Sequence, residues 1–165
     1  MKEANVMKNK VEKTNVCRVL DAKKVQYQMH TYEPDGSLTG QQIADILGED
    51  PSHVFKTLVT VGKTGNHYVF DVPVMMELDL KKAAAAVGEK NIEMITQKEL
   101  LPLTGYVHGG CSPIGMKKQF TTVMDSSAKD MDKIFVSGGK LGCQVELSPA
   151  DLEKVVKIKY ENIVK

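Results

Sequence analysis

Hydrophobic and polar positions recur with two different periods along this chain. Alternation with a period of two predicts about seven short strands, which are drawn from eight candidate segments: 27–32, 53–62, 67–73, 91–95, the start of 104–115, 121–127, 132–139 and 144–147. A helical period predicts five helices, within 11–24, 40–47, 78–88, 96–102 and 149–156. Because the strands come in hairpin-like pairs and not in regular alternation with helices, the pattern predicts an α+β fold with a mixed or largely antiparallel sheet curled into an open barrel.

Turn and cap residues separate these segments. Thr39 is placed to cap a helix that ends at Gly48, and Thr96 with Glu99 forms a capping box for a helix expected to end at Pro102. The segment 63–66, KTGN, predicts a tight turn between two strands. The strands at 53–62 and 67–73 are therefore expected to form a hairpin.

Composition changes this picture little. The chain has 165 residues, is 42% hydrophobic and 26% charged, and carries a net charge of +1, as expected of one globular domain. Residues 1–24 carry a net charge of +4, whereas residues 33–50 hold five acids and no base. This asymmetry fits either an RNA-binding surface or ordinary solvated charge, and both alternatives stay open.

Several functional classes lack support in the sequence. Cys17, Cys111 and Cys143 are far apart and His residues lack metal-ligand spacing, so neither a metal site nor a disulfide framework is expected. No dinucleotide fingerprint and no P-loop occurs, so no cofactor is expected. The chain shows neither a signal-peptide core nor a membrane span, which predicts a cytoplasmic protein.

Lys56 is the first candidate for chemistry. Alternation along 53–62 directs its ammonium to the same face as Val54 and Leu58, inside an otherwise apolar strand. Such a lysine is either an edge residue that reaches water or a cation on a rigid pocket wall that binds an anion or polarises a carbonyl.

Two glycine-rich segments are the other candidates. GYVHGGCSPIG at 105–115 and VSGGKLGC at 136–143 could present backbone N–H groups to an anion, or could simply be tight connections. Cys111 lies within the first segment, and His108 is three residues away. A nucleophilic role for Cys111 would need a base and a lowered pKa, for which the sequence offers little support.

Taken together and in order, these segments resemble the YbaK family of aminoacyl-tRNA deacylases. The resemblance rests on HTYE (30–33), VFKTL (54–58), LDLKK (78–82), GYVHGGCSPIGMKK (105–118) and VSGGKLGCQVEL (136–147), and it spans residues 12–160. It implies a single domain over residues 1–165, with the mixed, barrel-like fold of the editing domain inserted in bacterial prolyl-tRNA synthetases.

The resemblance assigns roles to individual residues. It implies catalytic roles for Lys56, Gly109, Gly110, Ser137 and Gly138. It implies substrate contacts for Tyr32, Thr57, Ser112, Pro113, Gly115, Gly139 and Gln144, with Lys140 completing the Ser-Gly-Gly-Lys turn. Two positions depart from the family pattern: Gln144 stands where close relatives carry Asp, and Cys111 stands where an aliphatic residue is common.

The resemblance also implies an activity and partners. Family members remove cysteine from mischarged Cys-tRNA(Pro), and in part from Cys-tRNA(Cys), beside prolyl-tRNA synthetase. Because no enzyme nucleophile stands out, the expected mechanism is attack by the substrate's own thiol on its ester, with Lys56 and the glycine N–H groups holding oxygens. The alternatives are a deacylase for Ala-tRNA(Pro) or another small aminoacyl-tRNA, and a non-catalytic protein that binds tRNA or the synthetase.

Overall fold

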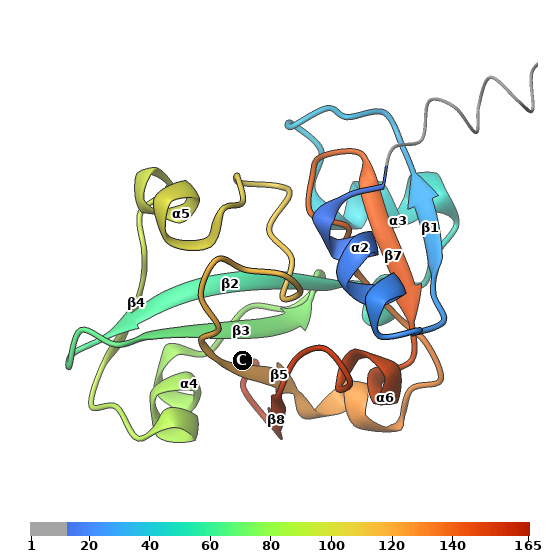
Figure 1. Cartoon of the computed structure of the whole chain (residues 1–165). Coiled ribbons are helices and arrows are strands. Elements are labelled where there is room, and N and C mark those ends of the chain that lie inside the picture. Colours follow the sequence, from blue (N-terminus) through green and yellow to red (C-terminus); the bar gives the residue numbers. More distant parts are fainter. Residues whose placement is uncertain (1–12) are drawn as a thin grey trace, which may run out of the picture.

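The computed structural model describes residues 13–165, which form two β-sheets and five α-helices (Figure 1). The larger sheet has the order β4-β2-β3-β5-β8, and the smaller one has the order β1-β7-β6. The strands are β1 (Gln28–Thr31), β2 (Phe55–Gly62), β3 (His67–Pro73), β4 (Ile92–Met94), β5 (Thr121–Asp125), β6 (Ile134–Ser137), β7 (Cys143–Leu147) and β8 (Ile158–Glu161). The helices are α2 (Asn15–Ala22), α3 (Gly40–Leu47), α4 (Leu80–Val87), α5 (Gln97–Thr104) and α6 (Pro149–Leu152).

The β2–β3 hairpin organises the larger sheet. Its two faces bury different cores, as the alternation of side chains requires. One face, with Leu58, Phe70 and Val72, packs under α4, and the other, with Val59 and Val69, packs under α5 and the loop that follows it. Figure 1 shows α4 and α5 on opposite sides of this sheet.

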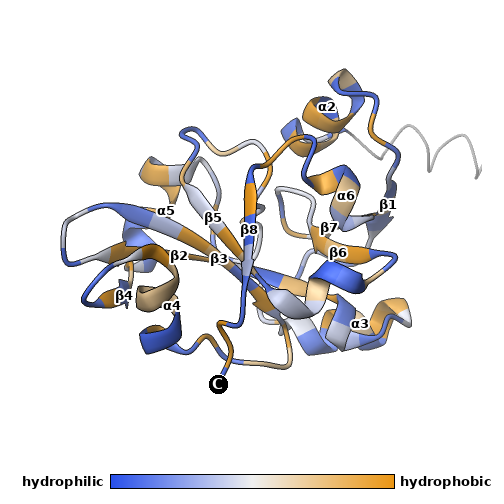
Figure 2. Ribbon diagram, turned by 90° about the horizontal axis from the view of Figure 1, so that it is seen from below, coloured by the Kyte–Doolittle hydropathy of each residue, from blue (hydrophilic) through white to orange (hydrophobic). Residues whose placement is uncertain are grey.

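The smaller sheet packs against α2. Val16 and Leu20 of that helix meet Val136 and Val145 of β6 and β7 in one buried cluster. Figure 2 shows hydrophobic positions, in orange, on β6, β7 and α2. An isolated bridge between Val54 and Phe135 joins the start of β2 to β6, so the two sheets meet where β2 begins.

Several predictions from the sequence are confirmed. The mixed α+β fold and the β2–β3 hairpin are present, with Phe55 opposite Pro73 at one end of the ladder. Helix α3 begins after a Thr39 capping box and ends at Gly48 in the left-handed conformation. Thr96 and Glu99 likewise form a capping box at the start of α5.

Other predictions are wrong. The sheet is not curled into a barrel: the strands divide into two separate sheets, whose edge strands β4, β8, β1 and β6 do not pair with one another to close a ring. Helix α5 continues through Pro102 to Thr104, and the segment after it is a loop and not a strand. Strands β5 and β6 do not form a hairpin, because β5 lies between β3 and β8 in parallel pairings. Strand β8 was not predicted.

Part of the expected first helix and of the basic stretch lies outside the described residues. Within residues 13–165, no helix is long and apolar enough to cross a membrane.

Candidate active site

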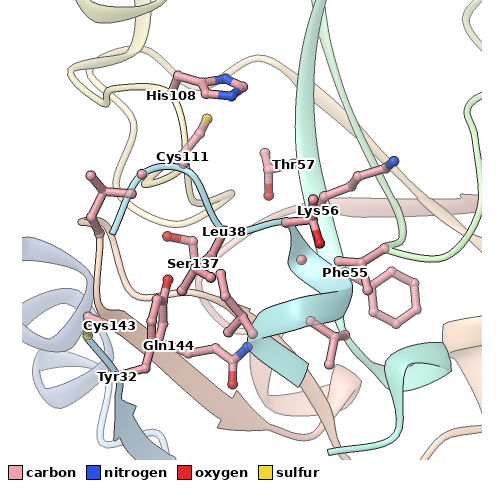
Figure 3. Close-up of a pocket in the computed structure, with 18 of the residues that line it drawn as sticks. Tyr32, Leu38, Phe55, Lys56, Thr57, His108, Cys111, Ser137, Cys143 and Gln144 are labelled. Carbon is pink, nitrogen blue, oxygen red and sulfur yellow. The ribbon is translucent and has the colours of Figure 1, made fainter. Parts of the chain in front are cut away.

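A cavity of about 420 Å³ opens where the two sheets meet (Figure 3). Its wall comes from the start of β2, from α3 and the loop before it, from the loop after α5, and from the β6–β7 turn. The residues that line it include Tyr32, Leu38, Ile43, Lys56, Thr57, Leu100, His108, Gly109, Cys111, Ser137, Leu141, Cys143 and Gln144.

The edge of β2 is open for a short stretch between two points of pairing. Strand β4 pairs with Thr60, Val61 and Gly62, and the bridge to β6 lies at Val54, so among residues 13–165 no ladder partner covers Lys56, Thr57 and Leu58 on that side. Val74 N donates to Val54 O across the hairpin. Because hydrogen-bonded pairs recur at every second residue of an antiparallel ladder, the peptide groups of Lys56 bond to β3, whereas those of Thr57 face the open edge.

Lys56 lies in the cavity wall on this strand and is half-buried. Figure 3 shows the Lys56 side chain extending on one side of β2, whereas Thr57 and Cys111 lie on the other side. Among the residues described by the structure, no carboxylate lies within ion-pairing distance of the Lys56 ammonium. A cation without a protein counter-ion on a rigid strand is available to an anionic or carbonyl-bearing ligand.

Thr57 is coupled to a carboxyl group behind the wall. It lies opposite Asp71 on β3, and its hydroxyl donates to Asp71 Oδ1 at 2.5 Å. Asp71 is fully buried, and no residue from 13 to 165 forms a hydrogen bond with its Oδ2. Burial raises the pKa of Asp71 to about 7, against the lowering effect of the Thr57 hydrogen bond. Sequence reasoning missed this residue.

The two glycine-rich segments pack against each other. A Cβ on Gly110 would lie 2.9 Å from the Lys140 Cα, and one on Gly109 would lie 2.6 Å from Leu141 Cδ2. Glycine at both positions therefore permits close contact between the loop after α5 and the β6–β7 turn. This contact brings Gly109, Ser137 and Leu141 to one wall of the cavity.

The expected cradle of glycine N–H groups is largely occupied by the protein itself. Gly110 N donates to Val107 O, Gly138 N donates to Cys143 O, and Gly139 N donates to Ser137 Oγ. These three amides are engaged within their own turns and are not free to bind an oxygen of a ligand. The prediction of a cradle built from them is wrong for this structure, because the turns use the same groups to close.

The predicted site residues divide into two groups. Those that line the cavity are Lys56, Gly109, Ser137, Tyr32, Thr57 and Gln144. Those that do not are Gly110, Gly138, Ser112, Pro113, Gly115 and Gly139. Ser112 is buried and accepts a hydrogen bond from Ile114 N, and Gly115 lies against Asn15 and Tyr106, so this part of the loop supports the wall from behind.

Cys111 and His108 both line the cavity, but the chemistry of Cys111 does not suit a nucleophile. Burial, together with the charge of Asp71, raises the pKa of the Cys111 thiol to about 12. A thiol with such a pKa is almost entirely protonated at neutral pH. The state of this thiol therefore argues against Cys111 as the reacting nucleophile.

A second cluster of polar residues lies around Gln144. His30 pairs with Gln144 in the β1–β7 register, and His30 Nε2 lies 2.7 Å from Glu146 Oε1. The Gln144 Oε1 atom and both carboxyl oxygens of Glu49 are buried without a hydrogen-bond partner. Burial raises the pKa of Glu49 to about 6, and the nearby Gln144 and His30 act in the opposite direction. Polar atoms thus remain unsatisfied on this side of the cavity.

Comparison with known proteins shows to which family the chain belongs. The family model of the aminoacyl-tRNA editing domain matches residues 34–155, which include every predicted site residue except Tyr32. The chain belongs to the aminoacyl-tRNA editing domain family. The matched segment of this chain includes the cavity-lining β2 and both glycine-rich segments.

Relatives of known name agree with this assignment. The chain is 44% identical over 153 residues to an Enterococcus faecalis protein named "Putative Cys-tRNA(Pro)/Cys-tRNA(Cys) deacylase EbsC", with 92% of this chain and 93% of that protein covered. It is 30% identical over 113 residues to the proline–tRNA ligase of Kosmotoga olearia, with 67% of this chain but only 19% of the ligase covered.

Solved structures show the same fold. A crystal structure described as "a putative trans-editing enzyme for prolyl tRNA synthetase" superposes with a TM-score of 0.78 at 24% identity, covering 91% of this chain and 94% of the other. The hypothetical protein APE2540 superposes with a TM-score of 0.82 at 22% identity, covering 92% of this chain and the whole of the other.

Proposed function

We propose that this protein is a trans-editing deacylase that removes cysteine from Cys-tRNA(Pro), and also from Cys-tRNA(Cys), by cleaving the aminoacyl ester. The observation that carries the proposal is the position of Lys56, which lines a small cavity and has no counter-ion among residues 13–165. The similarity to EbsC over nearly the full length of both chains supports the choice of substrate.

The cavity suits a small aminoacyl group. Leu38, Ile43 and Leu141 supply apolar walls, whereas Lys56 and Thr57 supply polar groups from the two faces of β2. Lys56 binds the ester carbonyl or the ribose end of the tRNA and stabilises the negative charge that develops on the oxygen. Tyr32, Ser137, Gln144 and Gly109 complete the contacts with the aminoacyl-adenosine end.

The nucleophile is the thiol of the substrate. An aminoacyl ester is already activated, so correct placement of an internal thiol near the carbonyl supplies much of the rate. Cys111 is unsuited to the role because its thiol stays protonated. This chemistry also excludes alanine, which has no thiol, more strongly than the roughly 1–3 kcal/mol that a methylene contributes to discrimination by size.

Prolyl-tRNA synthetase is the partner that supplies the mischarged tRNA. The similarity to part of the Kosmotoga olearia ligase supports this, because the matching segment occurs there within a prolyl-tRNA-charging enzyme. Residues 1–165 act as one editing domain in the cytoplasm, where tRNA is charged.

The test is deacylation of purified Cys-tRNA(Pro) and Ala-tRNA(Pro) by the wild-type protein, Lys56→Ala and Lys63→Ala. Lys63 is an exposed lysine beyond the far end of the same strand, and its replacement is the matched control. We expect cysteine release with kcat/KM reduced about 100-fold in Lys56→Ala and unchanged in Lys63→Ala.

Other results would contradict the proposal. Undiminished activity of Lys56→Ala would overturn the role of this residue. Faster release of alanine than of cysteine would favour the alanyl-tRNA deacylase, and binding without turnover of either tRNA would favour the non-catalytic alternative.

A further inference from the structure

We propose that Asp71, acting through the Thr57 hydroxyl, is the proton acceptor for the substrate thiol. The inference rests on the proposed function and adds a residue pair to it. Asp71 is a carboxylate-bearing residue at 0% exposure in the strand next to the cavity wall, and its Oδ2 has no hydrogen-bond partner in the described part of the chain. An unsatisfied buried carboxyl group is costly, so its retention needs a reason beyond stability.

The geometry connects this carboxyl group to the cavity. Thr57 lines the cavity, and its hydroxyl proton points to Asp71 Oδ1 at 2.5 Å. Because the hydroxyl proton of Thr57 is donated to Asp71, Thr57 Oγ1 can only accept a hydrogen bond from a ligand, through its lone pairs. A substrate thiol is such a donor.

The surroundings of Asp71 suit a proton acceptor. Across the ladder β5 presents Met124, and the neighbouring β2 residue Lys56 belongs to the opposite face of the sheet. The titratable group that faces Asp71 from the loop after α5 is Cys111, and the charge of Asp71 helps to raise the pKa of its thiol, which remains protonated. Burial raises the pKa of Asp71 to about 7, close to the operating pH at which a general base is most effective.

The step balances without any further reactant. The thiol proton passes to Thr57 Oγ1 while the Thr57 proton passes to Asp71 Oδ1. The sulfur forms a bond with the ester carbonyl carbon, and the bond from that carbon to the ribose oxygen breaks. The ribose oxygen then takes the proton back from Asp71 along the same route. The products are uncharged tRNA and a cyclic thioester of cysteine, which water opens.

The test compares Asp71→Asn, Thr57→Val, Thr57→Ser and the double variant Thr57→Val/Asp71→Asn with the wild type on Cys-tRNA(Pro). Removal of a general base lowers kcat by roughly 100-fold or more, whereas KM should change by less than about threefold. The double variant should be no slower than the slower single variant, because both changes break the same route. Thr57→Ser should restore most of the activity.

The pH profile and the stability separate this role from a structural one. The wild-type rate should rise with pH through an inflection near 7, and Asp71→Asn should lack that inflection. Asp71→Asn should also unfold at a higher urea concentration than the wild type at pH 8, because the variant no longer buries a charge. Asp125→Asn is the matched control, since Asp125 is a buried acid in β5 that bonds to Ser127 and Ile163 N and does not line the cavity. It should keep the inflection.

The results also distinguish this inference from the proposed function. If the wild type releases cysteine but Asp71→Asn stays within about threefold of its kcat, or keeps the inflection, the inference alone is overturned. If the effects of Thr57→Val and Asp71→Asn multiply, the shared route is overturned. If the wild type does not release cysteine from Cys-tRNA(Pro), the proposed function fails and the inference fails with it.

Discussion

Gly110 lies directly against the backbone of Lys140, and a Cβ at Gly110 would come within 2.9 Å of the Lys140 Cα and 3.1 Å of its carbonyl carbon. Backbone atoms cannot move aside as a flexible side chain can. We therefore expect Gly110→Ala to lower the free energy of unfolding by about 1–3 kcal/mol, in the range of overpacked interior sites. It should also reduce deacylation, since the two turns carry Gly109 and Ser137 into the cavity wall.

The control for this prediction is Gly36→Ala, measured by urea unfolding. Gly36 has only a side-chain atom of Leu141 at 3.8 Å, an ordinary contact distance. Its replacement should change the free energy of unfolding by less than about 1 kcal/mol. If Gly110→Ala and Gly36→Ala changed the free energy of unfolding equally, the close contact between the two turns would not contribute to stability.

Replacement of Cys111 should leave the chemistry intact. The pKa of its thiol is raised to about 12 by burial and by Asp71, so the thiolate needed for nucleophilic attack is not formed at neutral pH. Cys111→Ala should keep kcat within about threefold of the wild type, whereas loss of an enzyme nucleophile would cost several orders of magnitude. Single-turnover deacylation at pH 7.5 measures this, and a collapse of kcat in a folded variant would refute it.

Glu49 should make stability depend on pH. Its pKa rises from an ordinary 4.5 to about 6 in the folded protein, so between these values the folded state holds a proton that the unfolded chain has released. Stability from this group therefore falls as the pH rises from 4.5 to 6, and the loss is complete above that range. Glu49→Gln, which cannot ionise, should be more stable than the wild type by roughly 1 kcal/mol at pH 7.5, a value discounted for partial solvent access, and equal to it at pH 4.

Urea unfolding of both proteins at the two pH values provides the measurement. If Glu49→Gln raised the free energy of unfolding equally at pH 4 and pH 7.5, the effect would come from packing and not from ionisation of Glu49.

Thr39 should connect helix stability with the cavity wall. Its hydroxyl accepts from Gln42 N, and the Gln42 side chain accepts from Thr39 N, so both donors at the start of α3 are satisfied. Thr39→Ala should lower the free energy of unfolding by about 1 kcal/mol, whereas Thr39→Ser should be close to neutral. Because α3 contributes Ile43 to the cavity, Thr39→Ala should also raise KM, which steady-state kinetics on Cys-tRNA(Pro) can detect. If Thr39→Ala lowered the stability but left KM unchanged, the helix cap would have no influence on substrate binding.

Local signals allowed the hairpin and the capped helices to be predicted. The turn at 63–66 and the cap at Thr39 act over a few residues, so their physics is visible in short segments. The parallel pairings of β5 with β3 and β8 join residues 53 and 36 positions apart, and no short-range pattern encodes them. For the same reason β8 was missed and the division into two sheets was not foreseen.

The site was predicted in part for a related reason. Lys56 was recognised as a charge inside an apolar strand, and Asp71 in HYVFDVP presents the same signal one strand later. The alternation of side chains does not show that Asp71 lies opposite Thr57, because the register between the two strands of the hairpin determines which residues are opposite each other. The engagement of Gly110, Gly138 and Gly139 N–H groups within their own turns likewise depends on the conformation of each turn.

The division of the cavity wall between two sheets has a consequence for how activity is lost. Lys56 and Thr57 belong to the larger sheet, whereas Ser137 and Gln144 belong to the smaller one. If either half of the molecule opened locally while the other kept its hydrogen bonds, the two groups of residues would separate and catalysis would stop. The rate of cysteine release is therefore a sensor of sub-global opening. Loss of activity at denaturant concentrations that leave most of the circular dichroism signal intact would therefore report local separation of the two sheets before the whole protein unfolds.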